Sequence, residues 1–197
     1  MRGRNPNPRM ALASPELLAT LASMLTGWAG EELRVAMTLY TDAYIVRGVL
    51  MTRQRRLSDV LNHAEDEFLV LSDALFEPFG RKGAQHSAPF AQVNLAAVLF
   101  AVAGETIAPL PELRTPKIAE TTLISIPPFS ITGRIHLLPE RDIRDGLREL
   151  HGRFIPVTDA TFWSDVSRVA AQSAPMVAVN HGRAQILSPY GPGPAGE

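Results

Sequence analysis

The feature that most constrains this chain is a nine-residue segment that occurs twice. Residues 68–76 read FLVLSDALF and residues 154–162 read FIPVTDATF, so Phe, Asp, Ala and Phe hold the same positions and most other changes are conservative. Aligning Gly48 with Gly133 extends the match to the segments that come before. Self-similarity at a fixed spacing indicates repeated supersecondary units, so the sequence predicts an internal duplication.

Each half shows the same order of periodic segments. Apolar residues alternate over 33–39 and 43–52, which indicates two strands, and a short amphipathic helix and the repeated segment follow. A fourth strand is predicted over residues 90–103. The strands of the second half that match the first two are predicted on either side of Pro127-Pro128. We therefore predict a mainly β (α+β) fold of two tandem small β-barrel or bent-sheet units of ββαββ type, since closure removes exposed strand edges. An open α+β sheet is the alternative.

The predicted domain organisation follows from these patterns. An amphipathic helix that begins after Ser14-Pro15 is expected to precede the strands. The predicted parts are a flexible basic tail (1–13), the helix with the first β unit (14–107), a proline-rich linker (108–118), a second β unit (119–188) and a flexible tail (189–197).

Composition narrows the class of protein. The chain has 197 residues, 46% of them hydrophobic and 20% charged, and no apolar run long enough to span a membrane. Its 19 basic and 20 acidic residues leave no general field that would hold nucleic acid. It has no cysteine, which fits a cytoplasmic protein, and its basic N-terminus lacks the pattern of a signal peptide.

One stretch carries a family resemblance. The segment RLSDVLN at 56–62, followed by the strand that begins at Phe68, resembles an uncharacterised bacterial domain family with an RLSDxLN helix, a Phe-led strand and a closing Val-Asn strand. The second half keeps the strand and closes with Val179-Asn180, but its helix motif has diverged. This resemblance implies a tandem duplication, but no activity is known for the family.

A second, weaker resemblance is to Sm-like RNA-binding small β-barrels. Asp59-Val-Leu-Asn62 is similar to part of the first Sm motif, and Gly182-Arg183 with Ile186 is similar to the second. The two signals fall in different halves, and Ala103-Gly104-Glu105 stands where an arginine is usual. The resemblance implies nucleic-acid binding only if the function, and not just the barrel, is shared.

The sequence offers a ligand or partner patch and a set of structural residues. Basic residues, with an asparagine, form the predicted patch: Arg53, Arg55, Arg56, Asn62, Arg81, Lys82 and Arg183. A solvated surface is the alternative reading of that patch. Structural roles are predicted for Gly48 and Gly133 at bends, Phe68 and Phe154 in the core, and Asp73 and Asp159 at the turn after each repeated strand.

No catalytic, cofactor or metal residues are predicted. His63-Ala-Glu-Asp-Glu67 gathers groups that bind divalent metals, but no second histidine stands at ligand spacing, so an acidic loop is the preferred reading. The predicted function is a non-enzymatic protein-interaction or assembly module, a subunit of a larger complex or a homo-oligomer, without cofactors. The alternative is an Sm-like protein that binds RNA or single-stranded nucleic acid through Arg55, Arg56, Asn62 and Arg183.

Overall fold

A computed structural model describes residues 32–53, 56–62, 67–79, 84–104, 117–139, 142–166 and 169–191. Residues Leu33–Glu197 form one compact unit. The predicted N-terminal helix, the basic tail and most of the predicted linker lie outside the described residues.

The described part is mainly β, with ten strands, two six-residue α-helices and one 3-10 turn. In chain order the elements are β1 (Leu33–Thr41), β2 (Tyr44–Thr52), α2 (Leu57–Asn62), β3 (Phe68–Pro78), β4 (His86–Asn94), β5 (Val98–Ala103), β6 (Ile118–Ile126), β7 (Phe129–Leu137), α3 (Ile143–Arg148), β8 (Phe154–Ser164), β9 (Val169–Asn180), η2 (His181–Arg183) and β10 (Ile186–Pro189).

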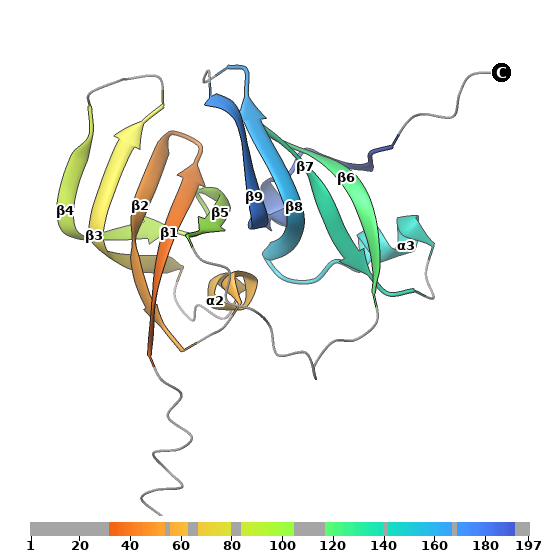
Figure 1. Ribbon diagram of the computed structural model, residues 1–197, viewed down its shortest axis with the longest axis horizontal. Coiled ribbons are helices and arrows are strands. Elements are labelled where there is room, and N and C mark those ends of the chain that lie inside the picture. Colours follow the sequence, from red (N-terminus) through yellow and green to blue (C-terminus); the bar gives the residue numbers. More distant parts are fainter. Residues whose placement is uncertain are drawn as a thin grey trace, which may run out of the picture. The chain divides into compact units, whose positions relative to one another are not determined.

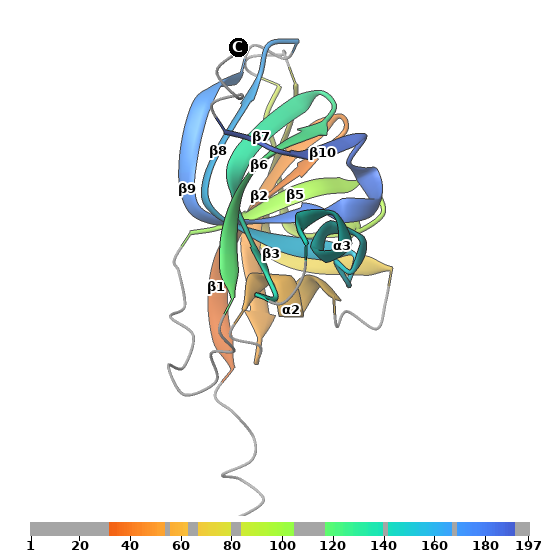
Figure 2. The same ribbon diagram turned by 90° about the vertical axis from the view of Figure 1, so that its right-hand side faces the viewer.

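All ten strands belong to one antiparallel sheet. Their order is β10-β6-β7-β8-β9-β5-β1-β2-β3-β4, so β10 and β4 are its two ends and the sheet is open. Figure 1 labels β4, and Figure 2 labels β10. The prediction of two tandem small barrels or bent sheets of ββαββ type is therefore wrong. Pairing between β5 and β9 joins strands of both halves into a single sheet.

The count of four strands per half is also wrong, because a turn divides the segment predicted as one strand over residues 90–103. The Oδ1 atom of Asn94 accepts a hydrogen bond from the backbone N–H of Ala96 at 2.8 Å, and the N–H of Ala97 bonds to the carbonyl of Asn94. This side-chain turn is typical of asparagine. The chain reverses there, and β5 becomes a separate strand.

The same strand order occurs twice in the sheet. We call β1–β5 (residues 33–103) the first block and β6–β10 (residues 118–189) the second block. The orders β5-β1-β2-β3-β4 and β10-β6-β7-β8-β9 correspond strand for strand. The registers correspond too, because Phe68 stands opposite Asn94 as Phe154 stands opposite Asn180. Each position of β3 and β4 thus has a counterpart 86 residues later.

Both blocks contain the same irregularity at the repeated segment. The β2–β3 register shifts around Gly48, and the β7–β8 register shifts around Gly133. Opposite each glycine lies an aspartate with a left-handed backbone, Asp73 or Asp159, at a φ of 50°. A Cβ atom at Gly133 would meet Val157 Cγ1 at 2.5 Å, so the strands approach too closely for a larger residue.

This irregularity corrects the expected role of the two aspartates. Both lie within their strands at a β-bulge, not at a turn after the strand. Asp73 pairs with Arg34 at 3.8 Å and Asp159 with Arg134 at 3.3 Å, both exposed to solvent. A bulge bends its strand and increases the local twist. Figure 2 shows the bent course of β8 and β9.

The hydrophobic core also extends across the boundary between the blocks. One cluster stacks Tyr40 on Phe100 at 4.4 Å and brings Phe129 and Phe162 of the second block against them. The other cluster, built mainly from the first block, includes Phe154 of the second. Because each block completes the core of the other, neither has a separate core.

Candidate interaction surface

The pairing of β5 with β9, which we call the junction, shows how this sheet accepts a neighbouring strand. Phe100, Ala101 and Val102 stand opposite Val179, Ala178 and Val177. Side chains on both faces of these strands are buried, since Phe100 belongs to one core cluster and Ala101 to the other. The junction therefore combines backbone pairing with burial on both faces of the sheet.

A side-chain amide adds two hydrogen bonds beside the junction. Asn62, at the end of α2, donates from Nδ2 to the carbonyl of Phe154 and accepts at Oδ1 from the Phe154 N–H, each at 2.8 Å. Gly152 makes room for this amide, because a Cβ there would lie 2.8 Å from Nδ2 of Asn62. The asparagine predicted to bind a ligand thus binds the backbone of the second block.

Asn180, the last residue of β9, and Arg183 in η2 contact the first block. Asn180 is buried and donates to the carbonyl of Val98 at 2.8 Å. Arg183 donates to the carbonyl of Ala96 and forms an ion pair with Asp42 at 3.1 Å. These contacts fix the chain at the start of β5.

The predicted basic patch is only partly visible. Arg55, Arg81 and Lys82 lie outside the described residues. Arg53 follows β2 and Arg56 precedes α2, and both are exposed. Asn62 and Arg183 do not contact each other but make separate contacts across the junction. Two residues of the predicted ligand patch therefore serve internal structure.

The two ends of the sheet carry exposed apolar side chains. Phe68 on β3 is 43% exposed, although its counterpart Phe154 is completely buried. Phe90 on β4 is 67% exposed, whereas its counterpart Met176 is partly buried against the core. The prediction that Phe68 enters the core is wrong. Its position in β3 is equivalent, but among the described residues no further block lies beyond β4 to cover it, as the first block covers Phe154.

Sequence reasoning missed Phe90, Ile186 and the pair Asn94 and Asn180 as features of this surface. Ile186 on β10, at the opposite end of the sheet, is 58% exposed. The Val-Asn pair that ends both β4 and β9 was the available signal, because it identifies these two strands as counterparts. Only the order of the strands in the sheet shows that β9 is paired with a further strand whereas β4 is at the end.

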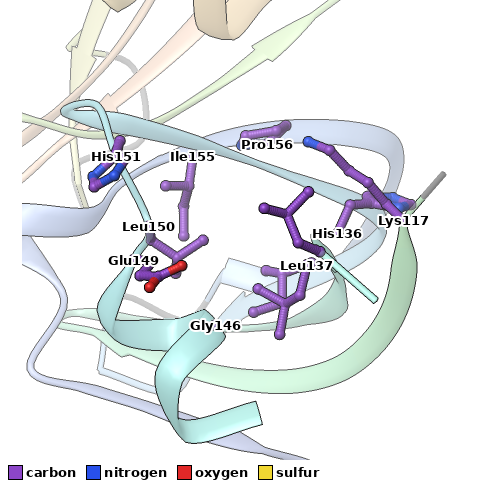
Figure 3. A pocket seen from close by; sticks show the side chains of 11 residues that line it. Lys117, His136, Leu137, Gly146, Glu149, Leu150, His151, Ile155 and Pro156 are labelled. Carbon is purple, nitrogen blue, oxygen red and sulfur yellow. The ribbon is translucent and has the colours of Figure 1, made fainter. Parts of the chain in front are cut away.

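A pocket of about 350 Å³ lies beside α3 in the second block (Figure 3). Apolar side chains form much of its lining, and polar side chains come from two sides. In Figure 3, His136 and Lys117 lie on one side, and Glu149 and His151 lie on the other. The complete lining is Lys117, Ile135, His136, Leu137, Leu138, Gly146, Glu149, Leu150, His151, Ile155 and Pro156.

His136 is the titratable group of this pocket with a shifted pKa. Burial lowers the pKa of His136, and the charges of Lys117 and Arg134 lower it further, while Asp159 opposes them. The Nε2 atom lies 2.9 Å from Thr158 Oγ1, and that hydroxyl donates to the carbonyl of Arg134 at 3.4 Å. The hydrogen bond between His136 and Thr158 joins β7 to β8 at the side of the pocket.

The described residues bring together neither the duplicated aspartates nor a set of metal ligands. Asp73 and Asp159 are on β3 and β8, which have four other strands between them, so they do not form an acid–base pair. Within the residues that the structure describes, no group of three or more His, Asp or Glu side chains could hold a metal ion. Most of the segment 63–67 lies outside them.

In the described part of the chain, no helix is long and apolar enough to cross a membrane. Comparison with protein-family models, with curated proteins and with solved structures finds no match.

Proposed function

We propose that this chain is a non-enzymatic interaction or assembly module, which binds a protein partner or further copies of itself through the edges of its sheet. The observation that carries this proposal is the contrast between Phe68 and Phe154. The same strand position is 43% exposed at the open end and fully buried where another strand follows. An exposed sheet edge with uncovered aromatic residues is a template for strand addition.

The chemistry of the edge supports a protein partner. Phe68, Val70 and Phe90 are exposed large apolar residues on β3 and β4. Clustered exposed apolar side chains typically mark contact with another protein. Nucleic acid would be held by basic residues, but Asn62 and Arg183 of that predicted set are engaged inside the molecule.

The experiment compares the natural chain with the double variant Phe68→Asp/Phe90→Asp in mass photometry and in affinity capture from native lysate. The natural chain is expected to form a complex, with itself or with a retained protein, that the double variant loses. Val166→Asp is the matched control, because Val166 is 84% exposed and lies between β8 and β9. A natural chain that stays single and retains no protein would refute the proposal.

A further inference from the structure

We infer that β4 of one copy pairs with β10 of a second copy, in the arrangement that β9 and β5 already adopt inside the chain. This inference rests on the proposed function and specifies its partner, its strands and its register. The starting point is topological: β4 corresponds to β9, and β10 corresponds to β5. One such pairing, between β9 and β5, is made inside the chain. The equivalent strands β4 and β10 lie at the two ends of the sheet, each with one edge unpaired.

The internal registers fix which residues meet. Met37 stands opposite Gly48 and Thr122 opposite Gly133, so Met37 and Thr122 are counterparts. Counting three residues along β1 and β6 gives Tyr40 and Ser125 as counterparts.

The partners of Tyr40 and Ser125 are Phe100 and Ile186, which are therefore counterparts as well. Inside the chain Phe100 stands opposite Val179. Between copies, Ile186 should stand opposite Val93, Leu187 opposite Gln92 and Ser188 opposite Ala91.

The side chains around the two edges fit this pairing. Internally, α2 packs on β8, and Leu57 and Leu61 of α2 are buried. Their counterparts on α3, Ile143 and Leu147, are partly exposed. Each edge thus leaves apolar residues exposed or only partly buried at positions equivalent to those around the internal junction: Phe68 and Phe90 on one edge, and Ile186 with the partly buried Ile143 and Leu147 on the other.

One polar contact should recur between copies. Asn180 donates to the carbonyl of Val98 inside the chain. Asn94 is the counterpart of Asn180, so its amide should donate to the carbonyl of Ala184 in the second copy. In contrast, Arg148 stands at the counterpart position of Asn62, and Ala97 at that of Arg183. The pairing between copies therefore lacks two internal contacts and should be reversible and dependent on concentration.

Pro89 sets the limit of the pairing. It lies in β4 beside the bulge, and Pro175 holds the same position in β9. Proline cannot donate a hydrogen bond, so it is confined to bulges and edges. Internally the pairing covers residues 177–179, beyond Pro175, and between copies it should cover residues 91–93, beyond Pro89. Since a different edge is used on each copy, successive chains join head to tail into a ring or a filament.

Disulfide trapping tests the register, because the natural chain contains no cysteine. In Ala91→Cys/Ser188→Cys the two thiols should stand opposite each other in neighbouring copies, at a Cβ separation of about 5 Å. Mild oxidation should produce a ladder of covalent dimers and larger species that reductant removes. Ser87→Cys/Ser188→Cys is the out-of-register control, since Ser87 lies on the other side of Pro89 in the same strand.

Assembly of the natural chain is measured in parallel by native mass spectrometry across a concentration series. Ala91→Lys should raise the half-assembly concentration about tenfold or more, whereas Ser87→Lys should not change it. A single chain at every concentration up to about 100 µM would overturn the inference. Assembly without in-register cross-linking would also overturn it, but would leave the proposed function standing.

Discussion

Phe154 and Phe68 begin two copies of one strand, yet the first is completely buried and the second is 43% exposed. The backbone register around them is the same, since each stands opposite an asparagine at the end of the next strand. Only their neighbours differ. Phe154, on β8, lies beside the junction of β9 with β5, and Phe68, on β3, lies beside β4, one end of the sheet. Burial at this position therefore depends on the presence of a neighbouring block, which at Phe154 includes α2, and not on the local sequence.

The largest effect is expected from truncating the two phenylalanines. Phe154→Ala should lower the free energy of unfolding by about 3–5 kcal/mol, because it removes a ring that the core fully encloses. Phe68→Ala should cost less than about 1 kcal/mol, because the ring is already partly in water. Urea denaturation of dilute protein measures both. Equal losses would show that the junction and the open edge do not differ as described.

Replacing the glycine at the bulge of either block should lower the stability of the protein. Gly133→Ala places a Cβ atom against Val157 and the carbonyl of Thr158, so it should cost about 1–3 kcal/mol of stability. Gly48→Ala should behave in the same way, because its Cβ would lie 2.8 Å from the Cβ of Leu71. Gly182→Ala is the control, since the nearest atom there is 3.6 Å away. Thermal unfolding of the three variants measures these losses of stability. An unchanged melting temperature in Gly133→Ala would contradict the prediction.

The asparagine at the junction should matter more than the one at the open edge. Asn62→Ala removes both hydrogen bonds to the Phe154 backbone and should cost about 1–3 kcal/mol. Asn94→Ala removes an exposed turn hydrogen bond and should cost about 0.5 kcal/mol in the single chain. Chemical denaturation at low concentration compares them. A neutral Asn62→Ala would mean that β8 is held at this point by packing alone.

The smallest effect is a pH dependence confined to the second block. The folded-state pKa of His136 is lowered, so the unfolded chain binds this proton more readily. Stability from this residue is therefore present above about pH 6.5 and is lost as the pH falls below that value. The melting temperature should drop slightly between about pH 7.5 and about pH 5.5. The melting temperature of His136→Gln should drop less over the same pH range. An equal drop in both proteins would exclude His136 as the cause.

Much of the local structure could be read from the sequence. Alternation from Leu33 predicted a strand, and the structure confirms β1 there, with β3 and β8 at the two repeated segments. The short helices at 57–62 and 143–148 follow from the spacing of their apolar residues. These features depend on residues close together in the chain, which is why periodicity and turn residues are sufficient to find them.

The division of 90–103 into two strands was missed for a local reason. Apolar residues run from Val93 to Ala103 with little interruption, and they hide the turn at Asn94. The same turn produces β5, the strand that receives β9. Because this turn was missed, two separate units were predicted where the structure has a single sheet.

The sequence by itself determined that the chain is mainly β and that one strand pattern occurs in both halves. It also determined that a glycine and an aspartate recur in each half. Only the tertiary structure decided that β5 and β9 pair, that Asn62 and Arg183 contact the other block, and that Phe68 is exposed. The physical reason is that two copies of a strand have the same local preferences. Whether their side chains are buried depends on a neighbour that is distant in the sequence, as Asn62 is from Phe154, 92 residues away.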